Sequence, residues 1–187
     1  GRVRKKCGSV ELTGHIDDFP HYLSSIPYDF GKYQIDTRNP NVRTQSIRGL
    51  GKILKDLALN VHGNHKFIPM EYFYGDVSQR LALLQGLMDT DGTVSERKIN
   101  SVASFTSNSE KLADGVSYLV NSLGGWTHKG RHNSGAYRLQ IHLNMPIFTL
   151  PRKAVKHKNN STVIVPIASI ERIADIQSQC IAVNNES

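Results

Sequence analysis

Two carboxylates close an apolar run near the middle of the chain. Residues 81–93 read LALLQGLMDTDGT, in which leucine and methionine recur at the spacing of one helix face. Asp89 and Asp91 stand at the end of that run, and Gly92 follows directly. The C-terminal end of a helix disfavours negative charge, and a divalent cation bound there would offset the repulsion. A hard cation held by carboxylate oxygens can activate water and stabilise charge in phosphodiester hydrolysis.

Hydrophobic periodicity and turn residues define the elements that must position these carboxylates. We expect the apolar run to form a helix, the motif helix, that begins at Asp76 or Ser78 and ends near Thr90. Further helices are predicted at residues 15–25, 50–57 and 109–123, and strands at 10–13, 28–35, 42–47, 93–99, 102–106, 126–129, 137–143, 162–170 and 179–183. The order helix, strand, strand, helix, strand, strand occurs once in full, and most of it also precedes the motif helix. This repetition favours a pseudo-symmetric α/β (α+β) architecture.

The motif run resembles a known family. Residues 84–92, LQGLMDTDG, resemble the signature of LAGLIDADG homing endonucleases, with Gln85 in place of the family's first alanine. Three other segments occur in the order found in the endonuclease domains (DOD-type) of inteins. They are HKFIP at residues 65–69, LVNSLGG at residues 119–125 and a strand pair within residues 168–183. The resemblance therefore covers most of the chain.

This resemblance implies a fold of two αββαββα halves with saddle-shaped antiparallel sheets. Residues 1–75 would form the first half without its motif helix, and residues 76–150 the second half. Residues 151–187 would form a basic linker and strands that lead back to an intein splicing domain. Such endonucleases pack two motif helices together, but this sequence contains one. We expect either a fragment, residues missing from the numbering, or a dimer whose second copy supplies the other helix.

The resemblance also assigns roles to single residues. Asp91 would be the catalytic metal ligand, for Mg²⁺ or another divalent cation such as Mn²⁺, whereas Asp89 is expected to hold the turn by accepting backbone hydrogen bonds. Lys66 would lie near the scissile phosphate and help to stabilise charge or activate water. Lys153 is a candidate for the corresponding lysine of the second half, with Lys156 and Lys158 as alternatives.

In this family strands read double-stranded DNA, because a twisted antiparallel sheet fits the major groove. Residues 137–143 alternate between polar and apolar side chains, so one face is capable of base contacts and the other can pack on helices. The DNA-binding candidates are Lys32, Gln34, Arg43, Gln45, Arg48, Arg97, Lys98, Asn100, Ser104, His128, Lys129, Arg131, Arg138, Gln140 and His142.

Composition is compatible with this interpretation but does not prove it. Among 187 residues, 23 lysines and arginines against 16 aspartates and glutamates give a net charge of +7, which suits either a polyanion partner or a merely soluble surface. Two cysteines fit a reducing compartment, so we expect an intracellular location in the cytoplasm or nucleoid. There is no apolar stretch long enough to span a membrane. The alternatives are a catalytically inactive DNA-binding domain and part of a protein-splicing element.

Overall fold

The chain folds into two halves joined by a central helix. The computed structural model describes residues 2–3, 10–96, 101–158, 167, 169–172 and 174–177. The first half contains β1 (Arg2–Val3), β2 (Val10–His15), the 3₁₀ turn η1 (Ile16–Asp18), α1 (Phe19–Ser25), β3 (Phe30–Ile35), β4 (Val42–Ile47) and α2 (Leu50–Asp56). The 3₁₀ turns η2 (Gly63–His65) and η3 (Met70–Phe73) lead to α3 (Val77–Asp91), β5 (Gly92–Glu96), β6 (Ser101–Ser107), α4 (Glu110–Ser122), β7 (Trp126–Arg131), β8 (Tyr137–His142) and α5 (Pro151–Ala154).

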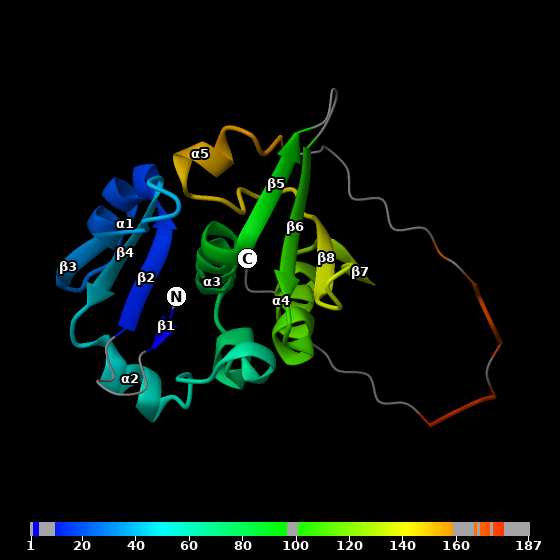
Figure 1. Cartoon of the computed structure of the whole chain (residues 1–187). Helices are drawn as coiled ribbons and strands as arrows, with labels where there is room; N and C mark the ends of the chain where they lie inside the picture. The colour runs from blue at the N-terminus through cyan, green and yellow to red at the C-terminus, as the bar shows by residue number, and fades with distance from the viewer. Residues whose placement is uncertain are drawn as a thin grey trace, which may run out of the picture.

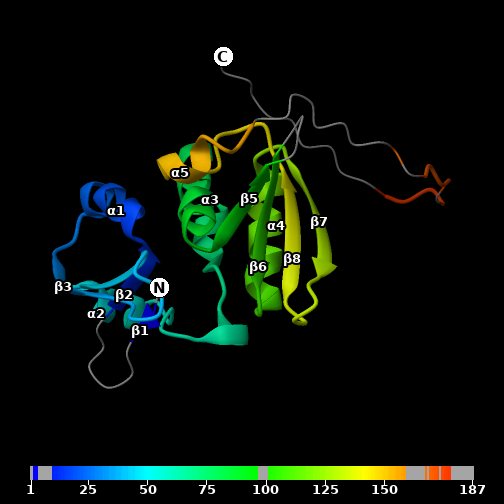
Figure 2. The ribbon, with the colours of Figure 1, turned by 45° about the horizontal axis from the view of Figure 1, so that its top comes forward.

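The two halves share one sheet topology. The first sheet has the order β1-β2-β4-β3 and the second the order β5-β6-β8-β7, and the neighbouring strands are antiparallel throughout. Figures 1 and 2 show α3 between the two sheets. The predicted mixed α/β fold with repeated antiparallel sheets is therefore confirmed.

The predicted helices and strands up to residue 143 form close to their expected bounds. The segment predicted as one helix at residues 15–25 begins as a 3₁₀ turn before α1. Local periodicity did not indicate α5, which begins with a proline and has only four residues. The strand predicted at residues 162–170 is not formed by its described residues, and residues 179–183 lie outside the described part of the chain.

The motif helix α3 has distinct signals at both ends. Asp76 accepts a hydrogen bond from the Gln79 amide at 2.7 Å, and Gln79 Oε1 accepts one from the Asp76 amide at 3.2 Å. This reciprocal capping box fixes the first turn. At the other end, a Cβ on Gly92 would lie 2.5 Å from the carbonyl oxygen of Met88, which explains a glycine at that position.

Each half has its own hydrophobic core. In the second half, α3 contributes Leu84 and Met88, both fully buried, to a core with residues of α4, β6 and β8. The first-half core includes Phe19, Tyr22 and, unexpectedly, Leu150 from the far end of the second half. None of the described helices is long and apolar enough to cross a membrane.

Candidate metal centre and nucleic-acid interface

Asp91 is the last residue of α3, and its side chain is exposed. It makes no hydrogen bond or ion pair within the described part of the chain, yet it is close enough to influence the pKa values of Tyr22 and Lys153. Burial raises the pKa of Tyr22 to about 12, and the carboxylates of Asp18, Asp89 and Asp91 act in the same direction. Asp91 therefore lies near other charged side chains of both signs, but its own oxygens bind no other group of the described chain.

Asp89, two residues earlier, is buried and fully engaged. Its carboxylate accepts hydrogen bonds from the Thr149 amide at 3.0 and 3.2 Å, from the Thr149 hydroxyl, and from the Leu150 amide at 3.2 Å. The expectation that Asp89 binds backbone N–H groups holds, but these groups belong to a segment about 60 residues away rather than to the local turn. The two motif carboxylates therefore have different environments.

Lys153 lies against the C-terminal end of α3 and is 8 % exposed. Its ammonium donates to the carbonyls of Met88 at 2.9 Å, Asp89 at 2.6 Å and Gly92 at 2.7 Å. Positive charge at this end favours the helix dipole. Burial lowers the pKa of Lys153, whereas the nearby Asp89 carboxylate opposes that shift.

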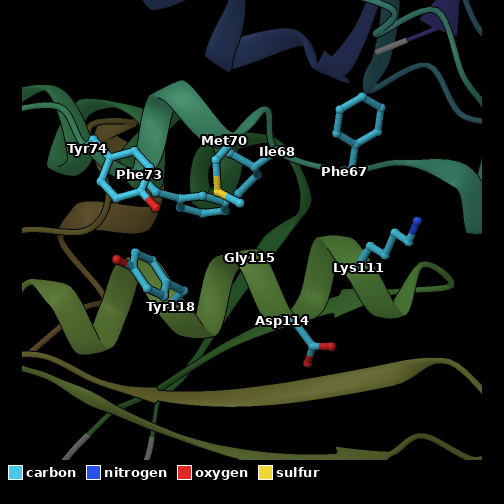
Figure 3. Close-up of a pocket in the computed structure, with 9 residues that line it drawn as sticks. All are labelled: Phe67, Ile68, Met70, Phe73, Tyr74, Lys111, Asp114, Gly115 and Tyr118. Carbon is cyan, nitrogen blue, oxygen red and sulfur yellow. The ribbon is translucent and has the colours of Figure 1, made fainter.

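Lys66 is held through its backbone. The Ser109 hydroxyl, at the start of α4, donates to the Lys66 carbonyl. Just beyond, Ile68 packs on Gly115 of α4, where a Cβ would approach Ile68 to 3.0 Å and Phe73 to 3.3 Å. Figure 3 shows Ile68, Gly115 and Phe73 among the residues that line an apolar pocket between residues 67–74 and α4.

The Lys66 side chain itself is half-buried and makes no hydrogen bond or ion pair with described residues. Lys66 and Asp91 both lie near the C-terminal end of β6. Gly92, which follows Asp91, pairs with Phe105, and β6 ends two residues later at Ser107, just before α4. Lys66 and Asp91 therefore lie toward the same end of the second sheet.

The second sheet has one face packed on helices and one open face. Leu139 and Ile141 are buried, and they pair with the buried Phe105 and Ala103 of β6. The alternate residues of β8 consequently point away from α4. The open face carries the predicted polar row Arg138, Gln140 and His142, with His128 opposite Gln140 on β7. Ser104 lies opposite Gln140 on β6, but it is 2 % exposed and its hydroxyl lies 2.9 Å from the Thr93 hydroxyl.

Two predicted DNA-binding residues of β7 lie on the other face. Lys129 pairs with Leu139, and its ammonium binds Asp114 at 2.6 Å and Glu110 at 3.2 Å on α4. Arg131 stacks on the Tyr137 ring at 3.7 Å and donates to the Tyr137 hydroxyl at 2.7 Å. Lys129 and Arg131 therefore lie on the side of the sheet that faces α4, and both are exposed. The sequence of β7 has no apolar alternation from which this side could be predicted.

Two DNA-binding candidates of the first sheet also face a helix. Gln45 is 6 % exposed, pairs with the buried Leu12, and accepts a hydrogen bond from Arg43 at 2.6 Å. Arg43 stacks on the Phe19 ring at 4.5 Å, so both side chains face α1 rather than open solvent. On the opposite face lies Gln34, which pairs with Thr44.

Of the remaining candidates, Lys32 and Arg48 are exposed, and Lys32 lies in the irregular pairing between Phe30 and Tyr33. Arg97, Lys98 and Asn100 lie outside the described residues. Within the described part of the chain no three His, Cys, Asp or Glu side chains form a group that could hold a metal ion. A cation at Asp91 would need further ligands from water, nucleic acid or another segment.

Comparison with known proteins locates the resemblance. Residues 78–145 match the family model described as LAGLIDADG-like domain. A replicative DNA helicase DnaB from Mycobacterium intracellulare is 35% identical over a region covering 69% of this chain and 24% of the helicase. A DNA polymerase from Thermococcus kodakarensis is 33% identical, covering 74% of this chain and 8% of the polymerase. The chain thus spans at most about a quarter of these relatives.

Among solved structures, I-DmoI in complex with DNA and Ca aligns with a TM-score of 0.48 and 17% identity, covering 79% of this chain and 81% of that one. I-DmoI in complex with DNA and Mn aligns with a TM-score of 0.44 and 18% identity, covering 71% and 73%. The family-model match includes most of α3 and all of β5 to β8. The residues that match the LAGLIDADG-like family model thus include Asp91 and the open face of the second sheet.

Proposed function

We propose that the chain is a site-specific, divalent-metal-dependent DNA endonuclease domain of the LAGLIDADG type, derived from an intein. The observation that carries this proposal is the environment of Asp91. It is an exposed carboxylate without a partner in the described chain, at the tip of a helix whose other face is buried. The carboxylate of Asp89 is occupied by hydrogen bonds to backbone amides, so Asp91 is the motif carboxylate that remains available to bind a metal ion.

The donor chemistry of Asp91 fits Mg²⁺ or Mn²⁺. Magnesium sites commonly use one or two carboxylates and complete the coordination shell with water and phosphate oxygens. When bound, such an ion supplies Lewis-acid stabilisation of the phosphoryl oxygens and a more acidic water. Asp91 would hold the ion, and Lys66, whose backbone is fixed by Ser109, would place a positive charge toward the same end of the sheet.

The DNA partner fits the charge and the sheet face. A net charge of +7 favours a polyanion, and the open row Arg138, Gln140 and His142 offers donors and acceptors that suit base edges or phosphates. His142 stacks on Trp126 at 3.9 Å, and its burial, with the neighbouring His128, lowers the pKa of His142. At neutral pH this side chain then acts as a neutral hydrogen-bonding group.

Cutting both strands requires a second acid, which we assign to a segment beyond this sequence or to a second copy. The exposed side of α3 is suited to a partner helix. Gly86 is exposed, and no heavy atom lies within 4 Å of the position that its Cβ would take. Close approach of two helices is easiest at such a residue.

The intein origin is supported by the pattern of relatives. A helicase and a polymerase differ in name, yet each matches most of this chain over only a small share of its own length. One mobile element inserted into different host proteins accounts for such matches. In the parent protein, the splicing domain would then be covalently linked to this domain.

The test is cleavage of a supercoiled plasmid library that carries randomised duplex inserts, in the presence of Mg²⁺. We expect linear product from a small subset of inserts and none in EDTA. Specific binding without cleavage in Mg²⁺ or Mn²⁺ would instead identify an inactive DNA-binding domain. Absence of both would overturn the proposal.

Arg138 and Arg131 provide a matched test of the DNA-binding face, since they lie on opposite sides of one hairpin. We expect Arg138→Ala to weaken duplex binding about fivefold or more and to lower the salt dependence, because a charged contact is lost. Arg131→Ala is expected to leave binding unchanged. Fluorescence anisotropy with labelled duplex at several salt concentrations measures both; equal losses would contradict the assignment of faces.

A further inference from the structure

A short segment after the second sheet, residues 149–153, contacts both the motif helix and the first half. We call it the bridging segment. Its Thr149 and Leu150 amides bind the Asp89 carboxylate of α3, as described above. Toward the first half, Arg152 forms a two-contact ion pair with Asp18, at 2.8 and 3.2 Å. The segment thus connects the motif helix with the other half.

Two additional contacts strengthen the connection to the first half. The Thr149 hydroxyl lies 2.9 Å from Nε2 of His21, on α1. Leu150 is fully buried in the first-half core with Phe19 and Tyr22. In Figure 1, α5 lies above α3, on the side that faces α1. Because Lys153 follows within the same segment, its position depends on both halves.

The hydrogen bonds of Lys153 exclude a direct role toward a phosphate in this arrangement. An ammonium has three N–H donors. The carbonyls of Met88, Asp89 and Gly92 accept one each, at 2.9, 2.6 and 2.7 Å. These carbonyls flank Asp91 on both sides along the backbone, so the lysine restrains the peptide that carries the carboxylate.

We propose that Lys153 is a positioning residue, which holds the Asp91 carboxylate in place through the backbone carbonyls around it, and that the bridging segment makes this placement depend on the first half. The inference rests on the proposed function, because it concerns the same metal ligand. It replaces the expected contact of Lys153 with the scissile phosphate. A lysine that only supplied charge near the site would repel a cation, whereas a positioning lysine increases the affinity of the site.

The two roles predict opposite changes in metal affinity. We expect Lys153→Met to weaken Mn²⁺ binding about tenfold, the loss typical when a partner that orients a metal ligand is removed. Removal of a merely repulsive charge would tighten Mn²⁺ binding instead. The measurement is a Mn²⁺ titration of the whole chain, followed by paramagnetic broadening of the backbone amide signals of residues 90–93.

Three further variants make the result unambiguous. Lys55→Met removes an exposed charge from α2 in the first half and is expected to leave Mn²⁺ affinity unchanged. Arg152→Gln, at a partly exposed side chain, loosens the bridging segment and should weaken Mn²⁺ binding even if Lys153→Met does not fold. Unchanged or tighter binding in Arg152→Gln, or tighter binding in Lys153→Met, would overturn the proposal. If Asp91→Asn does not alter the broadening, the metal site itself, and thus the proposed function, fails.

Discussion

Replacing Asp91 by asparagine is expected to abolish DNA cleavage while DNA binding persists. The exposed carboxylate loses its charge and one of its two oxygen acceptors, so the divalent cation loses its protein ligand. Metal-assisted stabilisation of a phosphoryl transition state amounts to several kcal/mol, which corresponds to a fall of about 10³-fold or more in the cleavage rate. Binding should be unchanged or tighter, because a negative charge near the phosphates is removed.

The measurement is single-turnover cleavage of a selected target, with binding followed separately in Ca²⁺ by gel shift. Glu71→Gln is a matched control, since it neutralises an exposed carboxylate at a distance from the end of α3. It should cleave at the rate of the original chain. Cleavage by Asp91→Asn within about tenfold of that rate would place the metal ligand elsewhere.

Local sequence patterns predicted the strands of both sheets except β1, together with the longer helices. Alternation in residues 137–143 corresponds to β8, whose odd-numbered side chains Leu139 and Ile141 are buried. A capping box at Asp76 and the glycine at residue 92 bound the motif helix within the chain. Such patterns predict local structure because they depend on residues that are close in sequence. The period of the apolar residues also indicates which face of an element is buried in the core.

Local patterns did not indicate which polar side chains bind other groups of the protein. Arg43 donates to Gln45 and stacks on Phe19 of α1, although Arg43 Nε has no hydrogen-bond partner among the described residues. Lys129, which is exposed, forms ion pairs with Asp114 and Glu110 of α4. For β4 a signal existed, because Ile47 lies on the same face as residues 43 and 45 and is apolar. For β7 there was no such signal, because its sequence WTHKGR does not alternate between apolar and polar residues.

The bridging segment was unpredictable for another reason. Asp89 and Thr149 are separated by 60 residues, and Asp18 and Arg152 by 134. No local pattern encodes such contacts, so the basic run from residue 151 was interpreted as a linker. Lys153 is buried because three backbone carbonyls, distant in sequence, accept hydrogen bonds from its ammonium.

Asp89→Asn should lower the stability of the fold, whereas Asp91→Asn should lower the cleavage rate, although the chemical change is identical and the positions are two residues apart. Every hydrogen-bond partner of the buried Asp89 carboxylate is a donor: two backbone amides and a hydroxyl. The carboxylate also lies near the positive charge of Lys153. An asparagine would direct an NH₂ group toward one of those donors and remove the neutralising charge. We expect the free energy of unfolding to fall by about 2 kcal/mol, the cost of leaving a buried hydrogen-bond donor without an acceptor.

Chemical denaturation monitored by circular dichroism measures this change, with Asp91→Asn as the internal control. The control should unfold within about 0.5 kcal/mol of the original chain, because Asp91 is exposed and its charge is unfavourable at a helix C-terminus. If both variants were equally stable, Asp89 would not be a structural tie between α3 and the bridging segment. Opposite phenotypes, stability loss at residue 89 and activity loss at residue 91, follow because one carboxylate faces protein donors and the other faces solvent.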